Sequence, residues 1–361
     1  MCFKILQFHK LKQKNTKLKV TRWKIMNKPN VYIAERLPKE VEQYIAKYCN
    51  YEKWDFHEKV PKEILFEKLV DKEGVMLTDV RIDDELLNHA PNLKVVSNIT
   101  VGYNNFDLEA MKRRKILGTN TPSVLNDTVA DLIIGLMLCS SRRIVELDRY
   151  VKDEKWIPRD EENICGLDVH HATLGIIGMG RIGEVVAKRA KFGFDMEVLY
   201  YNRNRKLEAE ERLGVKYCDF DSLLQKSDFI VVMPPLTKDT YHLIDTNEFN
   251  KMKNTAIFIN ASRGETVNEE ALIEALENNK IYAAGLDVYE IEPINFDNPL
   301  LKMPNVVTLP HEGTATKKTR LDMCMVAAEN LIKAVLGEVP PNVVPELRVS
   351  SRVSGQPPKK R

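Results

Sequence analysis

A glycine-rich motif follows an apolar segment near the middle of the chain. Gly178, Gly180 and Gly183 form the pattern G-x-G-x-x-G, after residues 174–177 and before a stretch of helical periodicity over 184–191. In this strand–turn–helix context such glycines bind the pyrophosphate of a dinucleotide. The first permits a tight turn, the second lets the phosphate approach the backbone, and the third lets the helix pack closely on the strand. An ordinary glycine-rich turn is the alternative.

The next predicted strand, residues 198–201, ends in a run of amides and cations. Asn202, Arg203, Asn204, Arg205 and Lys206 stand where a dinucleotide-binding unit usually carries an acid that accepts hydrogen bonds from the adenosine ribose. A 2′-phosphate carries nearly two negative charges and suits a guanidinium. The run therefore favours NADP(H) as the preferred cofactor and leaves NAD(H) open. A solvated charge run on a surface loop is the alternative.

Short runs rich in β-branched residues alternate with helical segments along most of the chain. Gly, Pro, Asn or Asp bound most of these runs, as they do buried parallel strands. The alternation indicates right-handed crossovers and an α/β, doubly wound parallel-sheet architecture. We also predict a long helix over residues 128–152 with Asp127 as its N-cap, and a second helix over 269–278. The predicted strands are residues 31–34, 75–78, 94–97, 173–177, 198–201, 229–233, 256–260, 284–288 and 306–309.

Length and charge distribution limit the class of protein. The 361 residues suffice for two domains, and 43% of them are hydrophobic. The formal net charge is +2, but residues 1–26 hold eight Lys or Arg and no acid, and residues 346–361 add +4, so the remainder carries −10. A body this acidic argues against nucleic-acid binding. No apolar run in the sequence is long enough to span a membrane.

The cysteines and the two ends of the chain give no sign of secretion. The six cysteines are scattered without a C-x-x-C pair, which predicts reduced thiols in a cytoplasmic protein and no metal site.

The basic segment 1–26 lacks the apolar stretch of a secretory signal. We interpret it as an extension outside the fold, with the natural start at Met26, and a mitochondrial presequence is the alternative. Residues 347–361 are expected to form a disordered tail.

Several blocks of residues together resemble the D-isomer-specific 2-hydroxyacid dehydrogenases. The resemblance spans about residues 28–346, and the subgroup it resembles most is that of the glyoxylate/hydroxypyruvate reductases and 2-ketogluconate reductases. The blocks, in chain order, are VGYNNFD at 101–107, the glycine motif at 178–183, NASRG at 260–264, GLDVYEIEP at 285–293 and PHEG at 310–313.

The resemblance implies three catalytic residues, Arg263, Glu292 and His311. The guanidinium of Arg263 would hold the carboxylate of a 2-keto acid and polarise its ketone. His311 would protonate the alkoxide that hydride transfer forms, while Glu292 would bind the other ring nitrogen and stabilise the imidazolium. Taken singly, each residue has a structural alternative: a helix-capping arginine, a solvated loop acid and a satisfied core histidine. Glu312 departs from the family pattern, and its charge would raise the pKa of His311 if it faced the ring.

The resemblance also implies binding residues outside the catalytic trio. The backbone N–H groups of Val101 and Gly102 would bind the substrate carboxylate together with Arg263. Asp287 would face the nicotinamide carboxamide, or it would serve only as a strand-end turn former. The cofactor-binding residues implied in addition to the glycines, Asn202, Arg203 and Arg205 are Thr128, Arg181, Ile182, Pro234, Ala261, Ser262, Asp287 and Gly313.

The family's architecture implies the domain boundaries and the assembly. A Rossmann domain that binds NAD(P), residues 127–314, would be inserted in a flavodoxin-like substrate-binding domain made of residues 27–126 and 315–346. The helix after Asp127 and the arm through Trp156 would pair two copies in a homodimer.

The expected activity is the NAD(P)H-dependent reduction of small 2-keto acids to D-2-hydroxy acids. The expected substrates are glyoxylate, hydroxypyruvate and 2-keto-D-gluconate. Two alternatives remain: an NAD-dependent dehydrogenase of phosphoglycerate, lactate or formate, and a cofactor-sensing transcriptional corepressor with the same fold.

Overall fold

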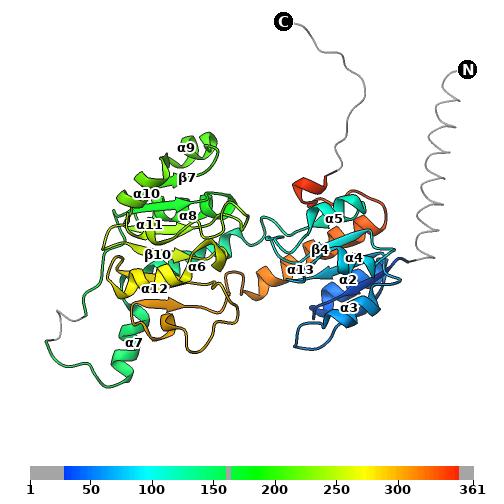
Figure 1. The fold of residues 1–361 in the computed structure, drawn as a ribbon, viewed down its shortest axis with the longest axis horizontal. Helices are drawn as coiled ribbons and strands as arrows, with labels where there is room; N and C mark the ends of the chain where they lie inside the picture. Colours follow the sequence, from blue (N-terminus) through cyan, green and yellow to red (C-terminus); the bar gives the residue numbers. More distant parts are fainter. Residues whose placement is uncertain (1–27, 160–163, 349–361) are drawn as a thin grey trace, which may run out of the picture. The chain divides into compact units, whose positions relative to one another are not determined.

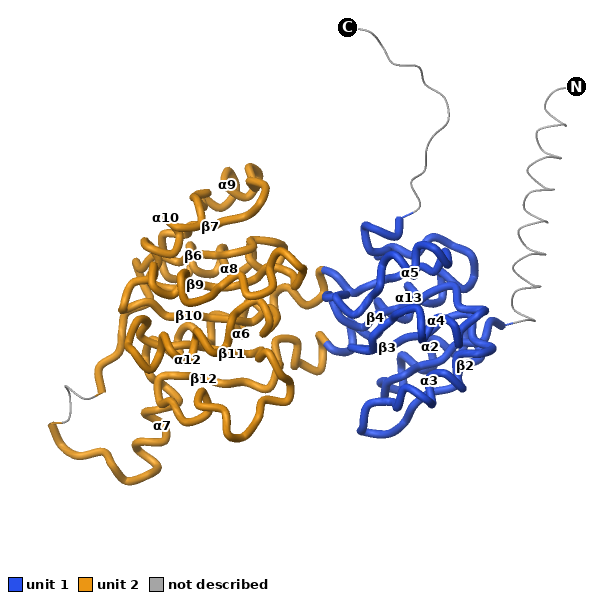
Figure 2. Tube along the Cα trace, in the orientation of Figure 1, with its two compact units in different colours: residues 1–122, 320–361 blue, residues 123–319 orange. Residues whose placement is uncertain are grey.

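The computed structural model describes residues 28–159 and 164–348, and the chain divides into two compact units (Figure 2). Unit 1 comprises the residues up to 122 and those from 320 onward, and unit 2 comprises residues 123–319. The basic segment 1–26, expected to be an extension, and the tail residues 349–361 lie outside the described residues.

Unit 1 is built on a parallel sheet with the strand order β2-β1-β3-β4-β5. Its strands are β1 (Asn30–Ile33), β2 (Asn50–Lys53), β3 (Gly74–Leu77), β4 (Val95–Asn98) and β5 (Leu117–Thr119). Its helices are α2 (Lys39–Tyr48), α3 (Lys62–Lys68), α4 (Asp84–Asn88), α5 (Leu108–Arg113), most of α13 (Lys317–Val335) and the short 3-10 helix η3 (Pro345–Leu347).

Opposite faces of the unit 1 sheet pack against different helices (Figure 1). Gly74 of β3 faces α13, because a Cβ at this position would lie 2.7 Å from Leu331 Cδ1. Helices α3, α4 and α5 cover the other face, where Leu65, Leu87 and Met111 are buried in one cluster with the strand residues that point toward them. The absence of a side chain at residue 74 therefore lets α13 approach the sheet closely.

Unit 2 is built on a second parallel sheet, with the strand order β12-β11-β10-β9-β6-β7-β8. Its strands are β6 (Thr173–Ile177), β7 (Glu197–Tyr201), β8 (Lys216–Tyr217), β9 (Phe229–Val232), β10 (Ile257–Asn260), β11 (Ala283–Leu286) and β12 (Val306–Thr308). Its helices are α6 (Asn126–Ser141), α7 (Ile144–Lys152), α8 (Arg181–Gly193), α9 (Leu207–Leu213), α10 (Phe220–Lys226), α11 (Thr246–Phe249) and α12 (Glu269–Glu277), with 3-10 helices η1 (Gly264–Thr266) and η2 (Pro299–Lys302).

Alternating residues of β11 separate the two faces of this sheet. Gly285 faces α6, since a Cβ there would lie 3.1 Å from Leu136 Cβ. Its neighbours Ala284 and Leu286 belong to the buried cluster that α10, α11 and α12 cover. Helices α6 and α8 pack against each other. All strand pairs within each of the two sheets are parallel, so the predicted doubly wound α/β architecture is confirmed.

Each predicted strand is present within two residues of its expected bounds, but three strands were not predicted. Strand β2 is an edge strand in which partly and fully exposed residues alternate, β8 has only two residues, and β5 has only three. These strands lack the continuous apolar run by which a buried strand is recognised.

The long helix predicted over residues 128–152 is wrong, because the chain forms α6 and α7 there. Arg143 interrupts the helical backbone with a φ of 54°, in the left-handed region. Asp127 lies inside α6 rather than capping it, and its carboxylate accepts a hydrogen bond from Arg189 Nη2 at 3.1 Å. The second predicted helix, over 269–278, corresponds to α12, with Asn268 as its N-cap. Among the described residues, no helix combines the length and apolarity needed to cross a membrane.

The expectation that the disordered tail begins at residue 347 is also wrong. Leu347 ends η3 and is only 7% exposed, in the cluster that includes Val343 and Val344. A Cβ on Gly118 would lie 2.9 Å from Leu347 Cδ1, so this leucine packs directly on β5. Apolar burial therefore holds the chain to unit 1 through residue 347.

We predict that Leu347→Ala lowers the free energy of unfolding of the full chain by about 2–4 kcal/mol, because it removes buried apolar atoms and leaves a cavity. Chemical denaturation measures this change. The control is Val339→Ala on the same segment, since Val339 is 86% exposed and its truncation should have almost no effect. Equal effects of the two substitutions would contradict the packing of Leu347.

Candidate active site

The three expected catalytic residues follow three neighbouring strands of unit 2. Arg263 comes after β10, Glu292 after β11 and His311 after β12. These strands are adjacent and parallel, so their carboxyl ends lie at the same edge of the sheet. That edge is where open α/β sheets bind ligands.

The loops after β10 and β11 are in close contact at Gly264. A Cβ at this position would overlap the carbonyl group of Tyr289, so no other residue fits there without moving the backbone. The backbone N–H of Tyr289 donates to Glu292 Oε1 at 3.1 Å. The close contact therefore sets Arg263 and Glu292 on neighbouring segments.

His311 and Glu292 form a direct pair, with Nδ1 of the imidazole 2.7 Å from Oε2 of the carboxylate. The hydrogen bond to Glu292 raises the pKa of His311 above its usual value, although burial acts in the opposite direction. Burial acts to raise the pKa of Glu292, but the hydrogen bond and charge of His311 outweigh it, and the pKa of Glu292 is lowered. The pair therefore favours an imidazolium next to a carboxylate. Nδ1 is the ring nitrogen that faces Glu292, so Nε2 is the one left to act on a substrate.

Hydrogen bonds to the backbone carbonyl of Arg263 stabilise the loop that carries this residue. That carbonyl accepts hydrogen bonds from Asn260 Nδ2 at 3.1 Å and from Thr266 Oγ1 at 2.7 Å. Its guanidinium donates from Nη1 to the carbonyl of Ser262 at 2.7 Å. The positive charge of Arg263 acts to lower the pKa of both Glu292 and His311. The three side chains are thus electrostatically coupled.

Asp287 anchors the loop that carries His311. Its two carboxylate oxygens accept backbone N–H hydrogen bonds from Glu312 at 2.7 Å and from Gly313 at 2.8 Å. The residue is 1% exposed, and burial raises its pKa despite these two hydrogen bonds. These contacts join the segment after β11 to the loop after β12. His311 itself has a φ of 55°, a conformation that non-glycine residues seldom adopt.

The glycine loop after β6 has the shape that a dinucleotide needs. Gly178 has a φ of 87°, and a Cβ there would lie 2.6 Å from the backbone nitrogen of Pro234. A Cβ on Gly180 would meet no atom within 4 Å, which leaves open space beside the first turn of α8. Gly183 brings α8 close to β6, since its Cβ would lie 3.3 Å from Ile176 Cγ2. The N–H groups of the α8 N-terminus can therefore bind phosphates in that space.

The residues after β7 have different surroundings. Asn202 donates from Nδ2 to the carbonyl of Met179 at 2.9 Å, so its amide joins the strand end to the glycine loop. Arg203 is 79% exposed and 3.8 Å from a carboxylate oxygen of Asp239. Arg205 instead pairs with Glu210 at 2.5 and 3.1 Å, which directs its guanidinium into a salt bridge. Of these two arginines, Arg203 therefore has the guanidinium that is more exposed to solvent.

The remaining expected residues lie at two separate places. In unit 2, Arg181 is exposed at the start of α8 and Ile182 and Ala261 are half-buried, while Thr128 Oγ1 lies 2.6 Å from Thr319 Oγ1. In unit 1, Val101 and Gly102 follow β4. Their carbonyls accept hydrogen bonds at 2.7 Å from Asn120 Nδ2 and Asn98 Nδ2 respectively. Within residues 28–159 and 164–348, neither of their N–H groups donates a hydrogen bond.

Sequence reasoning missed a second histidine–carboxylate pair beside the trio. Nε2 of His242 lies 2.6 Å from Oε1 of Glu290, two residues before Glu292. Glu290 and Glu269 exchange backbone–carboxylate hydrogen bonds at 3.1 and 3.2 Å. The backbone N–H of His242 donates to the carbonyl of Glu265. Nothing in the sequence marks His242, because the two ends of this contact are 48 residues apart and meet only in the fold.

The arrangement fits acid–base chemistry at a bound carbonyl compound. A cationic imidazole can donate a proton, an adjacent carboxylate stabilises its charge, and a guanidinium can bind a carboxylate or polarise a carbonyl oxygen. In the described parts of the chain, no three His, Cys, Asp or Glu side chains are grouped so as to hold a metal ion.

The family model of the D-isomer specific 2-hydroxyacid dehydrogenase NAD-binding domain matches residues 134–313. A glyoxylate/hydroxypyruvate reductase B from Escherichia fergusonii is 46% identical over 317 residues, which are 88% of this chain and 98% of the relative.

Two solved structures extend the likeness to the fold. One is an NADPH-dependent glyoxylate/hydroxypyruvate reductase from Sinorhizobium meliloti in complex with NADP and malonate, with a TM-score of 0.80 and 28% identity over 89% of this chain and 98% of that one. The other is a glyoxylate reductase from Paecilomyes thermophila, with a TM-score of 0.81 and 30% identity over 89% of this chain and all of that one. The chain therefore belongs to the D-isomer-specific 2-hydroxyacid dehydrogenases, a family of NAD(P)-dependent oxidoreductases.

Proposed function

We propose that the protein reduces glyoxylate and hydroxypyruvate to the corresponding 2-hydroxy acids with NADPH as its preferred cofactor, and that 2-keto-D-gluconate is a further substrate. The observation that carries the proposal is the 2.7 Å pair of His311 with Glu292, on the strand end next to that of Arg263. The names of the Escherichia and Sinorhizobium relatives support the substrate class.

In this proposal the three side chains have separate tasks. A bound reduced nicotinamide would supply a hydride to the carbonyl carbon of the substrate. Arg263 binds the keto acid and draws electron density toward the ketone oxygen, which stabilises the negative charge that develops there. His311 enters protonated and gives its proton from Nε2 to that oxygen. Glu292 holds the ring through Nδ1 and stabilises the imidazolium.

We propose that unit 2 binds the cofactor and that unit 1 supplies donors for the substrate carboxylate. The glycine loop supports the first assignment, because Gly178 and Gly180 leave room for a pyrophosphate beside α8. The loop at Val101 and Gly102 supports the second, since both carbonyls are tied back by amide side chains while the N–H groups remain available.

The protein is further proposed to act in the cytoplasm as a homodimer. Among the described residues, Cys49, Cys139, Cys218 and Cys324 form no disulfide bond, as is usual in a reducing compartment. Apolar side chains are exposed on α7 and just beyond it, including Val151 at 54% and Trp156 at 66%. A cluster of exposed apolar side chains is typical of a protein–protein contact.

We predict that Glu292→Gln shifts the basic limb of the pH–rate profile for glyoxylate reduction toward lower pH. The pKa of His311 is raised by Glu292, so removing the carboxylate charge lets the imidazolium lose its proton at a lower pH. The measurement is kcat against pH under conditions in which hydride transfer limits the rate. An unchanged basic limb would contradict the proposed role of the pair.

We predict a higher kcat/KM with NADPH than with NADH in a panel of glyoxylate, hydroxypyruvate and 2-keto-D-gluconate. The reason is that Arg203 can pair with a 2′-phosphate, and no carboxylate follows β7 to bind a ribose hydroxyl. Absence of turnover with every keto acid and both cofactors would refute the proposed function.

The double variant Asn202→Asp, Arg203→Ala isolates the cofactor preference. It should shift the NADPH:NADH ratio toward NADH by roughly ten- to hundredfold, the range expected for a charge-assisted hydrogen bond. Arg212→Ala is the control, since Arg212 pairs with Glu184 on α8 and should leave the ratio unchanged. A wild-type preference for NADH would refute the interpretation that residues 202–206 favour NADP(H).

We predict that Val151→Asp on α7 produces a monomer, because it places a charge in the proposed dimer contact. Sedimentation velocity would measure the change against a dimeric wild type. Phe296→Asp is the matched control, as Phe296 is 96% exposed on a different loop of unit 2. A monomeric wild-type protein would rule out the proposed homodimer.

A further inference from the structure

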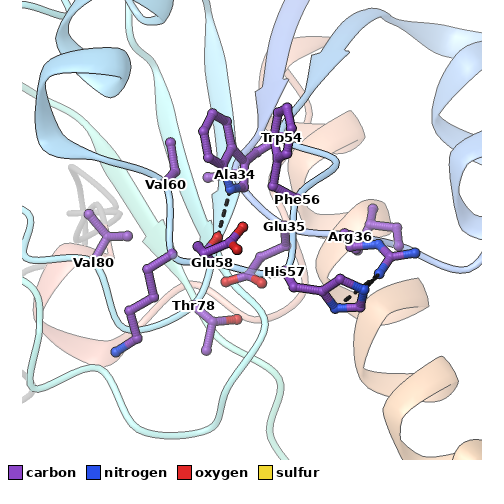
Figure 3. Close-up of a pocket in the computed structure, with 12 residues that line it drawn as sticks. Ala34, Glu35, Arg36, Trp54, Phe56, His57, Glu58, Val60, Thr78 and Val80 are labelled. Atoms are coloured by element: carbon purple, nitrogen blue, oxygen red, sulfur yellow. Dashed lines mark hydrogen bonds between the residues drawn. The ribbon is translucent and has the colours of Figure 1, made fainter.

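A cavity of about 410 Å³ lies in unit 1, and none of the residues proposed above to bind substrate or cofactor lines it (Figure 3). Its lining comes from the segments that follow β1 (34–37), β2 (54–60) and β3 (78 and 80). In the order β2-β1-β3-β4-β5, the winding of the chain reverses between β1 and β3. Open α/β sheets bind ligands at the carboxyl ends of strands beside such a reversal. The volume is within the usual range for a small-molecule site.

Two aromatic rings form one wall of this cavity. The rings of Trp54 and Phe56 have centroids 4.6 Å apart and planes inclined by 51°. Trp54 Nε1 donates to the carbonyl of Glu58 at 2.7 Å, so the loop after β2 is closed on itself and holds the indole in place. Such a wall offers an apolar surface to the C–H groups of a ligand.

Polar groups face this wall. Figure 3 shows the carboxylate of Glu35 directed toward Thr78. Burial raises the pKa of Glu35, although the neighbouring Thr78 acts to lower it. A half-buried carboxyl and a hydroxyl supply several acceptor positions for the O–H groups of a ligand.

Cations lie near the mouth of the cavity. Arg36 Nη1 is 2.7 Å from Nε2 of His57, and Arg36 Nε is 3.8 Å from a carboxylate oxygen of Asp55. Lys59 also lines the cavity and is exposed. An apolar wall, internal acceptors and cations at the mouth together match a molecule with a hydroxylated carbon chain and an acidic group.

We propose that this cavity binds the polyhydroxylated chain of a sugar acid, with its hydroxyls on Glu35 and Thr78 and its C–H groups on Trp54. The chain can belong to a substrate of the reaction or to a separate sugar acid whose carboxylate interacts with Arg36 and Lys59. The first source rests on the proposed function, and the second does not.

Binding is tested with D-gluconate and the full-length protein without cofactor, by isothermal titration calorimetry. We expect Glu35→Gln and Thr78→Val to weaken gluconate binding at least about tenfold, since the first replaces a charged acceptor oxygen with an amide donor and the second removes a hydroxyl. Glycolate, which lacks the hydroxylated chain, should bind equally to wild type and variants. Glu40→Gln on the exposed surface of α2 is the matched control. Thr78→Val keeps its shape, so it remains informative if Glu35→Gln is unstable.

Steady-state kinetics with NADPH show whether the hydroxylated chain in the cavity belongs to the substrate or to a separate sugar acid. If the substrate supplies the chain, the KM for 2-keto-D-gluconate rises about tenfold in both variants while the kinetic constants for glyoxylate stay the same. If a separate sugar acid binds, gluconate binding falls and the kinetic constants for both substrates are unchanged.

The proposal is overturned if stable variants match the wild type in gluconate binding and in both sets of kinetics, or if the wild type neither binds gluconate nor reduces 2-keto-D-gluconate. A wild type that reduces no keto acid refutes the proposed function, and the binding measurement still decides the cavity.

Discussion

The backbone contact between Gly264 and Tyr289 is the constraint on which the geometry of the candidate active site depends. Parallel strands bring their carboxyl ends to the same edge of the sheet, but the loops that follow them stay close only if a contact between the loops holds them. Here a glycine without a side chain lets the loops after β10 and β11 touch. Arg263 immediately precedes the contact. Glu292 follows it and uses one oxygen to accept the N–H of Tyr289, which leaves the other for His311.

The same edge of the sheet also organises the cofactor loop. Gly178 packs against the backbone of Pro234, at the end of the strand beside it, just as Gly264 packs against Tyr289. In both places a missing Cβ allows two strand-end loops to approach more closely than side chains permit. The sheet thus sets the order of the loops, and glycines set their separation.

The central strands and the glycine loop were predictable because their signals are local. Buried parallel strands are short apolar runs, and β6 at Thr173–Ile177 was predicted with its exact bounds. Gly178, Gly180 and Gly183 could be interpreted because the strand and helix that give them meaning are adjacent in sequence. Arg263, Glu292 and His311 carry no such local signal, and they were found by resemblance to a family rather than by periodicity.

The features that were missed depend on contacts between distant residues. Edge strands such as β2 are polar, so pairing and not composition creates them. The burial of Leu347 follows from tertiary packing, which overrides local propensity. The left-handed backbone at Arg143 was not predicted from the sequence. The pair of His242 and Glu290 and the cavity beside Trp54 likewise exist only once strand ends are brought together.

Asp287 holds the loop of His311 by two hydrogen bonds, and this affects the activation entropy of the proposed reaction. It holds the backbone on the carboxyl-terminal side of His311, while Glu292 holds the ring, so little freedom remains to the imidazole. The left-handed backbone of His311 is costly for a side-chain-bearing residue, and it is adopted once, when the chain folds. In the proposed mechanism each catalytic cycle therefore begins with the proton donor already oriented, and the ordering does not recur as part of the activation barrier.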